Sequence, residues 1–178
     1  SVKNVEINSD YFEGVVSVEQ LDGGWKPWRL PHTEQLLFPS PDDALIARAE
    51  NCSGVRLRFD TNSQQIQLIV EVGTEVNPVT GRNAFVFDAT IDSELILSVS
   101  VKPGDTKVVF TSLPEGEKTV EIWFPQDSPI VLRELSVDDE AYCVVSEDPR
   151  PRWVTYGSSL THCVRAHSPA RIWPAILA

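Results

Sequence analysis

Val55-Arg56-Leu57-Arg58-Phe59 decides the fold class of this chain, because apolar and charged side chains alternate at every residue. Successive side chains of a β-strand point to opposite faces, so a period of two predicts a strand with one buried face and one wet face. The same alternation recurs in residues 66–72 and again in residues 120–124. We therefore expect a mainly β protein built from half-buried strands.

Turn-forming residues separate these strand patterns. The main turn signals are Asp22-Gly23-Gly24, Asn77-Pro78, Pro103-Gly104-Asp105 and Pro114-Glu115-Gly116. Strands that recur with such turns between them, and with no helical apolar stripe, favour a sandwich or barrel. We predict an antiparallel, jelly-roll-like β-sandwich over residues 1–146, with about ten strands in two sheets.

Charge excludes some classes of partner. The chain has 178 residues with 15 basic and 26 acidic side chains, and its net charge is −11. Nucleic acids and anionic membranes attract clustered Lys and Arg, so we expect neither as a partner. The apolar runs are short and no signal peptide opens the chain, so we expect a soluble protein and favour the cytoplasm.

The pattern changes after residue 146. Residues 147–152 are polar and contain two prolines, which is typical of a linker. Residues 153–156 then predict a short strand, which small residues follow at once, and Pro174 suits the first turn of a helix. We interpret residues 153–178 as the first strand and helix start of an α/β domain that is truncated here.

Tyr156-Gly157-Ser158-Ser159-Leu160-Thr161 resembles the first sequence block of the SGNH, or GDSL, hydrolases. Serine replaces the customary aspartate at position 158, a variant of members that carry an N-terminal β-sandwich. Upstream, residues 28–31 and 53–61 are similar to that carbohydrate-binding-module-like sandwich. The resemblance covers the whole chain, and the block around Ser159 is its most specific part.

The resemblance implies that Ser159 is the nucleophile and also a backbone oxyanion donor, with Gly157 and Ser158 in supporting roles. The local chemistry agrees. A serine hydroxyl must be presented beside a base and near N–H donors for the oxyanion, and a strand that turns into a helix at a glycine presents it so. Free N–H groups at the start of a helix favour a developing negative charge.

The rest of the family's catalytic set cannot be placed in this chain. The family implies an oxyanion glycine and asparagine and an Asp-x-x-His near the C-terminus, but 19 residues follow Ser159. His162 and His167 are interpreted as surface or packing residues rather than the base. We expect the 178-residue chain alone to be inactive, and its parent to be an enzyme that needs the remainder of its catalytic domain.

The implied activity is acyl-ester hydrolysis through an acyl-serine intermediate, on a carbohydrate or small-molecule ester. Transfer of the acyl group to an alcohol acceptor is an alternative that uses the same nucleophile. A non-catalytic carbohydrate-binding sandwich is an alternative of a different class. The sequence makes no prediction of oligomeric state.

Tryptophans are the candidate ligand contacts of the sandwich. Trp25 and Trp28 lie in a Gly- and Pro-punctuated stretch, where they could stack on a sugar or instead close the core or an interdomain contact. Trp123 alternates out of phase with its apolar neighbours, so it faces either solvent or the second domain. Arg56 and Arg58 should lie on an outer face, paired with carboxylates.

No metal or other cofactor is predicted. The three cysteines and three histidines do not occur at zinc-site spacings, so isolated thiols are expected. The acidic runs at residues 42–43 and 138–140 are interpreted as solvated loops, with a calcium site as the alternative.

Overall fold

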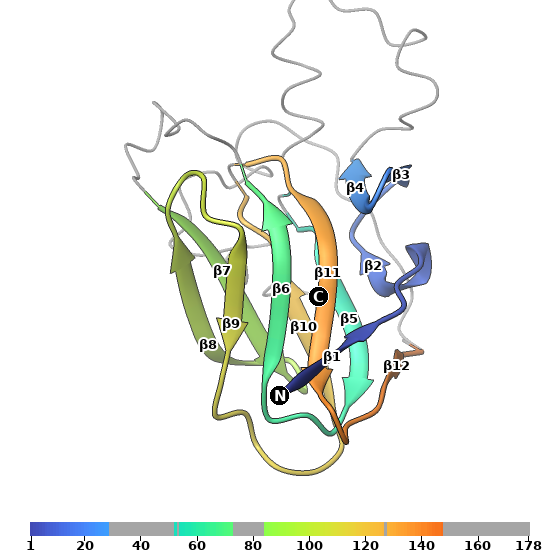
Figure 1. Cartoon of the computed structure of the whole chain (residues 1–178), viewed down its shortest axis with the longest axis vertical. Helices are drawn as coiled ribbons and strands as arrows, with labels where there is room; N and C mark the ends of the chain where they lie inside the picture. The colour runs from blue at the N-terminus through green and yellow to red at the C-terminus, as the bar shows by residue number, and fades with distance from the viewer. Residues whose placement is uncertain (29–51, 53, 73–83, 127, 148–178) are drawn as a thin grey trace, which may run out of the picture.

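The computed structural model describes residues 1–28, 52, 54–72, 84–126 and 128–147. These residues form twelve strands and one short 3-10 helix, and the strands make two sheets packed face to face (Figure 1). The predicted antiparallel β-sandwich is confirmed. The expected strand and helix start within residues 153–178, and residues 148–152 of the linker, lie outside the described residues.

The first sheet, sheet A, has the order β3-β4-β11-β6-β9, and β1 also pairs with β11. Its strands are β1 (Val2–Val5), β3 (Ser17–Leu21), β4 (Gly24–Trp28), β6 (Ile66–Glu71), β9 (Lys107–Phe110) and β11 (Val131–Asp138). The helix η1 (Ser9–Tyr11) follows β1 along the chain.

The second sheet, sheet B, has the order β12-β5-β10-β7-β8, and β2 also pairs with β5. Its strands are β2 (Phe12–Glu13), β5 (Arg56–Thr61), β7 (Phe85–Ile91), β8 (Glu94–Val101), β10 (Lys118–Trp123) and β12 (Cys143–Val145). From β4 onward, consecutive strands alternate between the sheets except at the β7–β8 hairpin. Residues distant in sequence therefore become neighbours.

The core lies between the sheets and is built by the alternating residues. Leu57 and Phe59 of β5, Leu68 of β6 and Ile122 of β10 are fully buried, which confirms the period-two interpretation of these segments. Phe124 extends the same inward series, and its ring meets that of a β7 phenylalanine edge to face at 5.8 Å between centroids. Such aromatic pairs add about 0.5–1.5 kcal/mol beyond the area they bury.

Two hairpins differ in whether their turn can be recognised from the sequence. Asp22-Gly23 links β3 to β4 as predicted, and Gly23 has the positive φ of 72° that glycine tolerates. Asp92 and Ser93 link β7 to β8 with φ values of 49° and 71°, and no glycine marks this turn. Two hydrogen bonds to β10 hold this turn although it has no glycine. The Thr119 amide donates to Asp92 Oδ1 at 3.2 Å, and the Asp92 amide donates to the Thr119 carbonyl.

Candidate functional site

The predicted catalytic block lies outside the described residues. Gly157, Ser158 and Ser159 therefore stay predictions from the sequence, as do the interpretations of His162 and His167. The site that the structure does describe is on the sandwich, on the side of sheet B that faces away from the core.

Six residues of three adjacent strands share this side of sheet B. We call them the outer cluster: Arg56, Arg58, Asp88, Thr90, Glu121 and Trp123. The antiparallel register places Glu121 between Arg58 of β5 and Thr90 of β7, and it places Trp123 between Arg56 and Asp88. Side chains at paired positions of neighbouring strands contact one another, so three strands converge on one patch.

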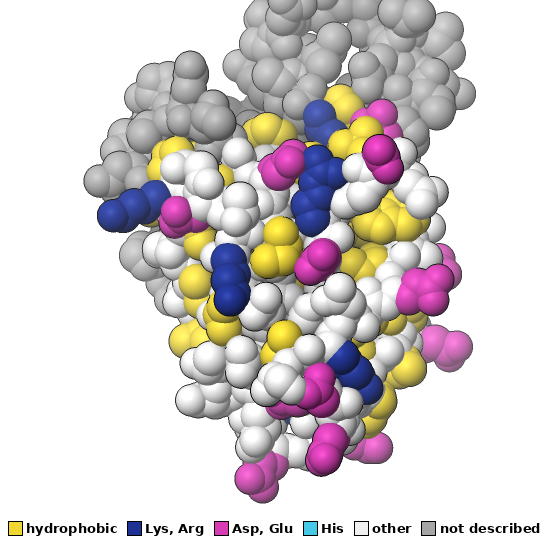
Figure 2. Space-filling view, viewed as in Figure 1, with side chains coloured by type: hydrophobic (Ala, Val, Ile, Leu, Met, Phe, Trp, Pro, Cys, Tyr) yellow, Lys and Arg dark blue, Asp and Glu magenta, His cyan; other side chains and the backbone are white. Residues whose placement is uncertain are grey.

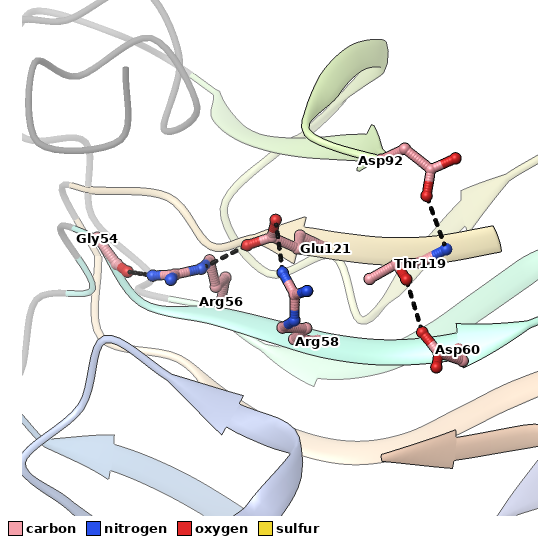
Figure 3. Close-up of polar contacts among 7 residues, drawn as sticks. All are labelled: Gly54, Arg56, Arg58, Asp60, Asp92, Thr119 and Glu121. Carbon is pink, nitrogen blue, oxygen red and sulfur yellow. Dashed lines mark hydrogen bonds and ion pairs between the residues drawn. The ribbon is translucent and has the colours of Figure 1, made fainter. Parts of the chain in front are cut away.

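Glu121 is the electrostatic centre of the outer cluster (Figure 3). Arg56 Nε donates to its Oε2 at 2.6 Å, and Arg58 Nη1 donates to its Oε1 at 3.3 Å. The carboxylate side chain is 5% exposed, and the two arginine side chains are 14% and 11% exposed. The predicted pairing of both arginines with a carboxylate is confirmed, and the pairing takes place away from bulk solvent.

Trp123 completes this arrangement. The guanidinium carbon of Arg56 lies 4.7 Å from the centre of the Trp123 ring, within the range of a cation–π contact. The indole is 5% exposed. Alternation correctly placed Trp123 away from the core, but the solvent-facing alternative is wrong, because the side chain is buried on this outer face.

The start of β5 is fixed by a close backbone approach. Arg56 Nη1 donates to the Gly54 carbonyl at 3.2 Å (Figure 3). A Cβ atom at Gly14, where φ is 74°, would collide with that same carbonyl oxygen. Glycine at position 14 therefore lets the segment that follows β2 lie against the chain that enters β5, which positions Arg56.

Two further polar contacts extend over this side of sheet B. Thr119 Oγ1 of β10 donates to Asp60 Oδ1 of β5 at 2.7 Å (Figure 3). On the opposite flank, Ser98 Oγ of β8 donates to Asp88 Oδ1 at 2.6 Å, and Asp88 is fully buried. Side-chain hydrogen bonds thus join the strands of sheet B across most of its width.

Trp25 and Trp28 take different positions on β4. Trp25 packs against the core cluster. Trp28 is 4% exposed, its Nε1 donates to Glu19 Oε1 at 3.1 Å, and the Lys26 ammonium lies 4.4 Å from the centre of its ring. These contacts favour the packing alternative over an open platform for a sugar, and ligand contact by either tryptophan stays a prediction.

Cys143 is not an activated thiol. Burial raises its pKa from the ordinary 9.0 to about 12, with the Asp60 carboxylate adding to the rise and a hydrogen bond with Tyr11 opposing it. Burial also raises the pKa of Tyr11 to about 12. Because the thiolate is the nucleophilic form of cysteine, this protonated thiol is structural. Cys52 and Cys143 form no disulfide with each other.

The described residues bring no three His, Cys, Asp or Glu side chains together in a way that could hold a metal ion. The acidic run at residues 138–140 is part of this search, whereas residues 42–43 lie outside the described part of the chain. No described residue belongs to a helix of the length and apolarity that crossing a membrane requires.

Comparison with known proteins gives this sandwich a family. Residues 10–133, more than half of the chain, match the model of the SsfX3 N-terminal domain. The chain belongs to this family. A solved salicylyl-acyltransferase, SsfX3 from a tetracycline biosynthetic pathway, is 30% identical with a TM-score of 0.85, and the match covers 98% of this chain and 50% of that one.

A second solved structure, a GDSL-like lipase from Bacteroides ovatus, shares the fold. It is 22% identical with a TM-score of 0.75, and the match covers 99% of this chain and 53% of that one. The chain thus spans about half the length of these two relatives. No curated protein matches it. The resemblance to SGNH/GDSL-type enzymes with an N-terminal sandwich is confirmed.

Sequence reasoning missed three members of the outer cluster in this SsfX3-type sandwich. The alternation in residues 118–123 contained the signal for Glu121, since it places this residue on the same side as Trp123. Asp88 and Thr90 lie in a strand where they alternate with the apolar residues Phe87, Ala89 and Ile91. Which strands pair with which, and in what register, was the missing information.

Proposed function

We propose that this chain is the N-terminal part of a serine enzyme that transfers acyl groups, and that Ser159 is its nucleophile. The observation that carries the proposal is the similarity to the salicylyl-acyltransferase, which extends over 98% of the chain and is not confined to the sandwich. The sequence block Gly157-Ser158-Ser159-Leu160 supplies the reactive hydroxyl.

The chemistry proceeds in two steps. Ser159 Oγ attacks the carbonyl carbon of an ester, its proton passes to a base, and the alcohol of that ester leaves with a proton. Ser159 then carries the acyl group as an ester. Water or an acceptor alcohol attacks this second ester and regenerates the serine hydroxyl. The backbone N–H of Ser159 stabilises the oxyanion in both steps.

Hydrolysis and transfer differ only in the molecule that attacks the acyl-serine. The sequence block is the same for both, and we propose a carbohydrate or small-molecule ester as the substrate class. The relationship to an acyltransferase favours transfer as the second candidate. We propose residues 1–146 as the sandwich, 147–152 as a linker and 153–178 as the start of the catalytic domain.

Labelling with a fluorophosphonate tests the proposal in a protein that contains the whole catalytic domain. We expect one phosphonate adduct on Ser159, detected by mass spectrometry of its peptide. Ser159→Ala should abolish the adduct, whereas Ser158→Ala, a neighbouring hydroxyl, should leave the adduct on Ser159. An adduct that survives Ser159→Ala would overturn the assignment of the nucleophile.

A separate experiment identifies the molecule that accepts the acyl group. With p-nitrophenyl acetate as donor, the ratio of free acetate to ester formed on an added alcohol distinguishes hydrolysis from transfer. The 178-residue chain should release no nitrophenol above its Ser159→Ala variant, because the base and two oxyanion donors that the family requires are not assigned within it. Binding of oligosaccharides by the chain, with no labelling of Ser159 in the longer protein, would favour the non-catalytic module.

A further inference from the structure

Strand β8 ends sheet B with an edge that has no strand beside it in the described part of the chain. It is the last strand in the order of sheet B, pairs with β7 alone, and lies at the left margin of the sandwich (Figure 1). The N–H and C=O groups of alternate residues in a strand point to opposite edges, so every second residue of β8 directs them away from β7. Such a row of unpaired groups is a template for another strand.

Most of β8 lacks the features by which edge strands avoid such pairing, which are short length, charges and prolines. Of the other strands that end the sheets, β3 has five residues with Glu19 among them, β9 has four with Lys107, and β12 has three. β8 has eight residues, and residues 95–101 carry no charge. Ile96 has no partner on β7, so a bulge interrupts the ladder there, but residues 97–101 pair regularly.

The side chains of β8 also leave apolar surface at this edge. Ile96 is 42% exposed. Leu97 and Val99 pack against the core cluster but are only partly buried. At the β9 edge of sheet A, by contrast, Phe110 is fully buried. A strand laid along β8 would therefore cover apolar side chains and pair the free backbone groups at the same time.

We propose that β8 pairs antiparallel with β8 of a second copy of this chain, about a two-fold axis near Ser98, and so joins two B sheets into one. Two copies with a net charge of −11 each repel one another, so they need a contact surface without like charges, and residues 95–101 provide one. Antiparallel pairing of two identical strands is self-complementary, as a closed dimer requires.

Opposite charges at the two ends of β8 favour this occupant over an unrelated extended peptide. Glu94 begins the strand and Lys102 follows its end, so antiparallel pairing brings Glu94 of each copy beside the partner's Lys102. Both residues are exposed, and neither side chain has an ion pair in the ranges that the structure describes. The Lys102 amide donates to Asp105 Oδ2 at 2.9 Å, a backbone contact that leaves the ammonium available.

Exchanging these charges tests the proposal in the 178-residue chain. Sedimentation equilibrium should show a monomer–dimer equilibrium of modest affinity, because one pair of strands makes a small interface. Glu94→Lys and Lys102→Glu should each raise the dissociation constant about tenfold, since both ion pairs of the dimer become contacts between like charges. The double variant restores opposite charges and should recover the original affinity.

A lysine on the exposed surface of β8 should dissociate the dimer as well. Ile96→Lys replaces apolar surface near the two-fold axis with a charge from each copy. Val16→Lys is the matched control, because Val16 is 46% exposed outside β8 and the net charge changes equally. It should leave the dissociation constant unchanged. Hydrogen exchange of the amides in residues 97–101 that point away from β7 should slow as the protein concentration rises.

A chain that stays monomeric at high micromolar concentration would overturn the proposal, as would a dimer with the same affinity in the single and double charge variants. The longer enzyme should also be a dimer. If it were a monomer whose β8 amides exchange slowly at every concentration, its own catalytic domain would cover β8 and the second copy would be excluded. The proposal does not depend on Ser159, so fluorophosphonate labelling tests the proposed function separately.

Discussion

The two sheets carry the same kind of ion pair in opposite surroundings. On sheet A, Arg133 Nη2 donates to Glu71 Oε1 at 2.8 Å, and the side chains are 29% and 55% exposed. On sheet B, Arg56 Nε donates to Glu121 Oε2 at 2.6 Å, with 14% and 5% exposed. The two distances are similar. We therefore expect burial, more than distance, to set how much each ion pair contributes to the free energy of unfolding.

The outer face of sheet A looks like ordinary protein surface. Figure 2 shows blue and magenta side chains scattered over this face among apolar and neutral ones. Arg133 also donates to the Asp22 carbonyl at 2.8 Å, so it joins the β3–β4 hairpin to β11. Water can replace these contacts, whereas the cluster on sheet B has little access to water.

Removing the centre of the buried cluster should have the largest effect at neutral pH. Glu121→Ala takes away the carboxylate that accepts from Arg56 and Arg58, so two largely buried arginines each lose a negatively charged partner. Breaking such a pair costs about 3–5 kcal/mol of stability. Because the arginines are partly exposed, we expect Glu121→Ala to lower the free energy of unfolding by about 3 kcal/mol. Urea unfolding of the 178-residue chain measures it. Glu121→Gln, which keeps the shape and an acceptor, should lose less.

High pH should lower the free energy of unfolding because of Cys143, which lies on the inner side of sheet B. Its pKa is raised from 9.0 to about 12, so the folded thiol keeps its proton while the unfolded one loses it. Stability is therefore constant below about pH 9 and falls from pH 9 to pH 12, by at most about 1.4 kcal/mol per pH unit for this group. Urea midpoints across this range test it. In Cys143→Ala the decline should be shallower, and an unchanged slope would contradict the assignment.

Loss of a hydrogen bond at the β8 edge of sheet B should lower the free energy of unfolding by a smaller amount. Ser98→Ala removes the hydroxyl that donates to the buried Asp88 carboxylate. We expect a loss of about 1 kcal/mol, since hydrogen bonds contribute about that much and Ser98 itself is exposed. Ser100→Ala, at a neighbouring exposed position of β8, is the control and should be neutral. Equal losses of unfolding free energy at both positions would mean that the hydrogen bond to Asp88 does not contribute to stability.

The exposed pair should give the smallest change. Glu71→Ala breaks the contact with Arg133 in solvent, which is worth about 0.2–1 kcal/mol and less at high salt. The same urea experiment measures it beside Glu121→Ala. If the two alanine variants lost equal free energy, burial would not distinguish the two pairs, and the contrast between the sheets would fail.

Much of the fold was predictable because it depends on local periodicity. A side chain's face is set by strand parity alone, so Leu57 and Phe59 were correctly placed inside and Arg56 and Arg58 outside. The Asp22-Gly23 hairpin was predictable from its glycine, whereas Asp92-Ser93 was not, because hydrogen bonds to Thr119 on another strand hold it.

The candidate site was predictable only in part. The serine block is a local pattern of consecutive residues, so it can be recognised without any knowledge of strand pairing, and its role stays a prediction. The partner of Arg56 lies 65 residues away in sequence, and that of Arg58 lies 63 residues away. Nothing in an alternating strand says which other strand pairs with it or in what register.

The sequence by itself therefore determined the class of fold, the inward and outward faces of the strands around residues 55–59, 66–72 and 120–124, and the kind of family to which the chain belongs. The tertiary structure alone decided that one carboxylate, Glu121, serves two arginines and that Trp123 is buried on an outward face. The physical reason is that alternation sets the direction of a side chain, whereas its burial and partners depend on what strand pairing and packing bring against it.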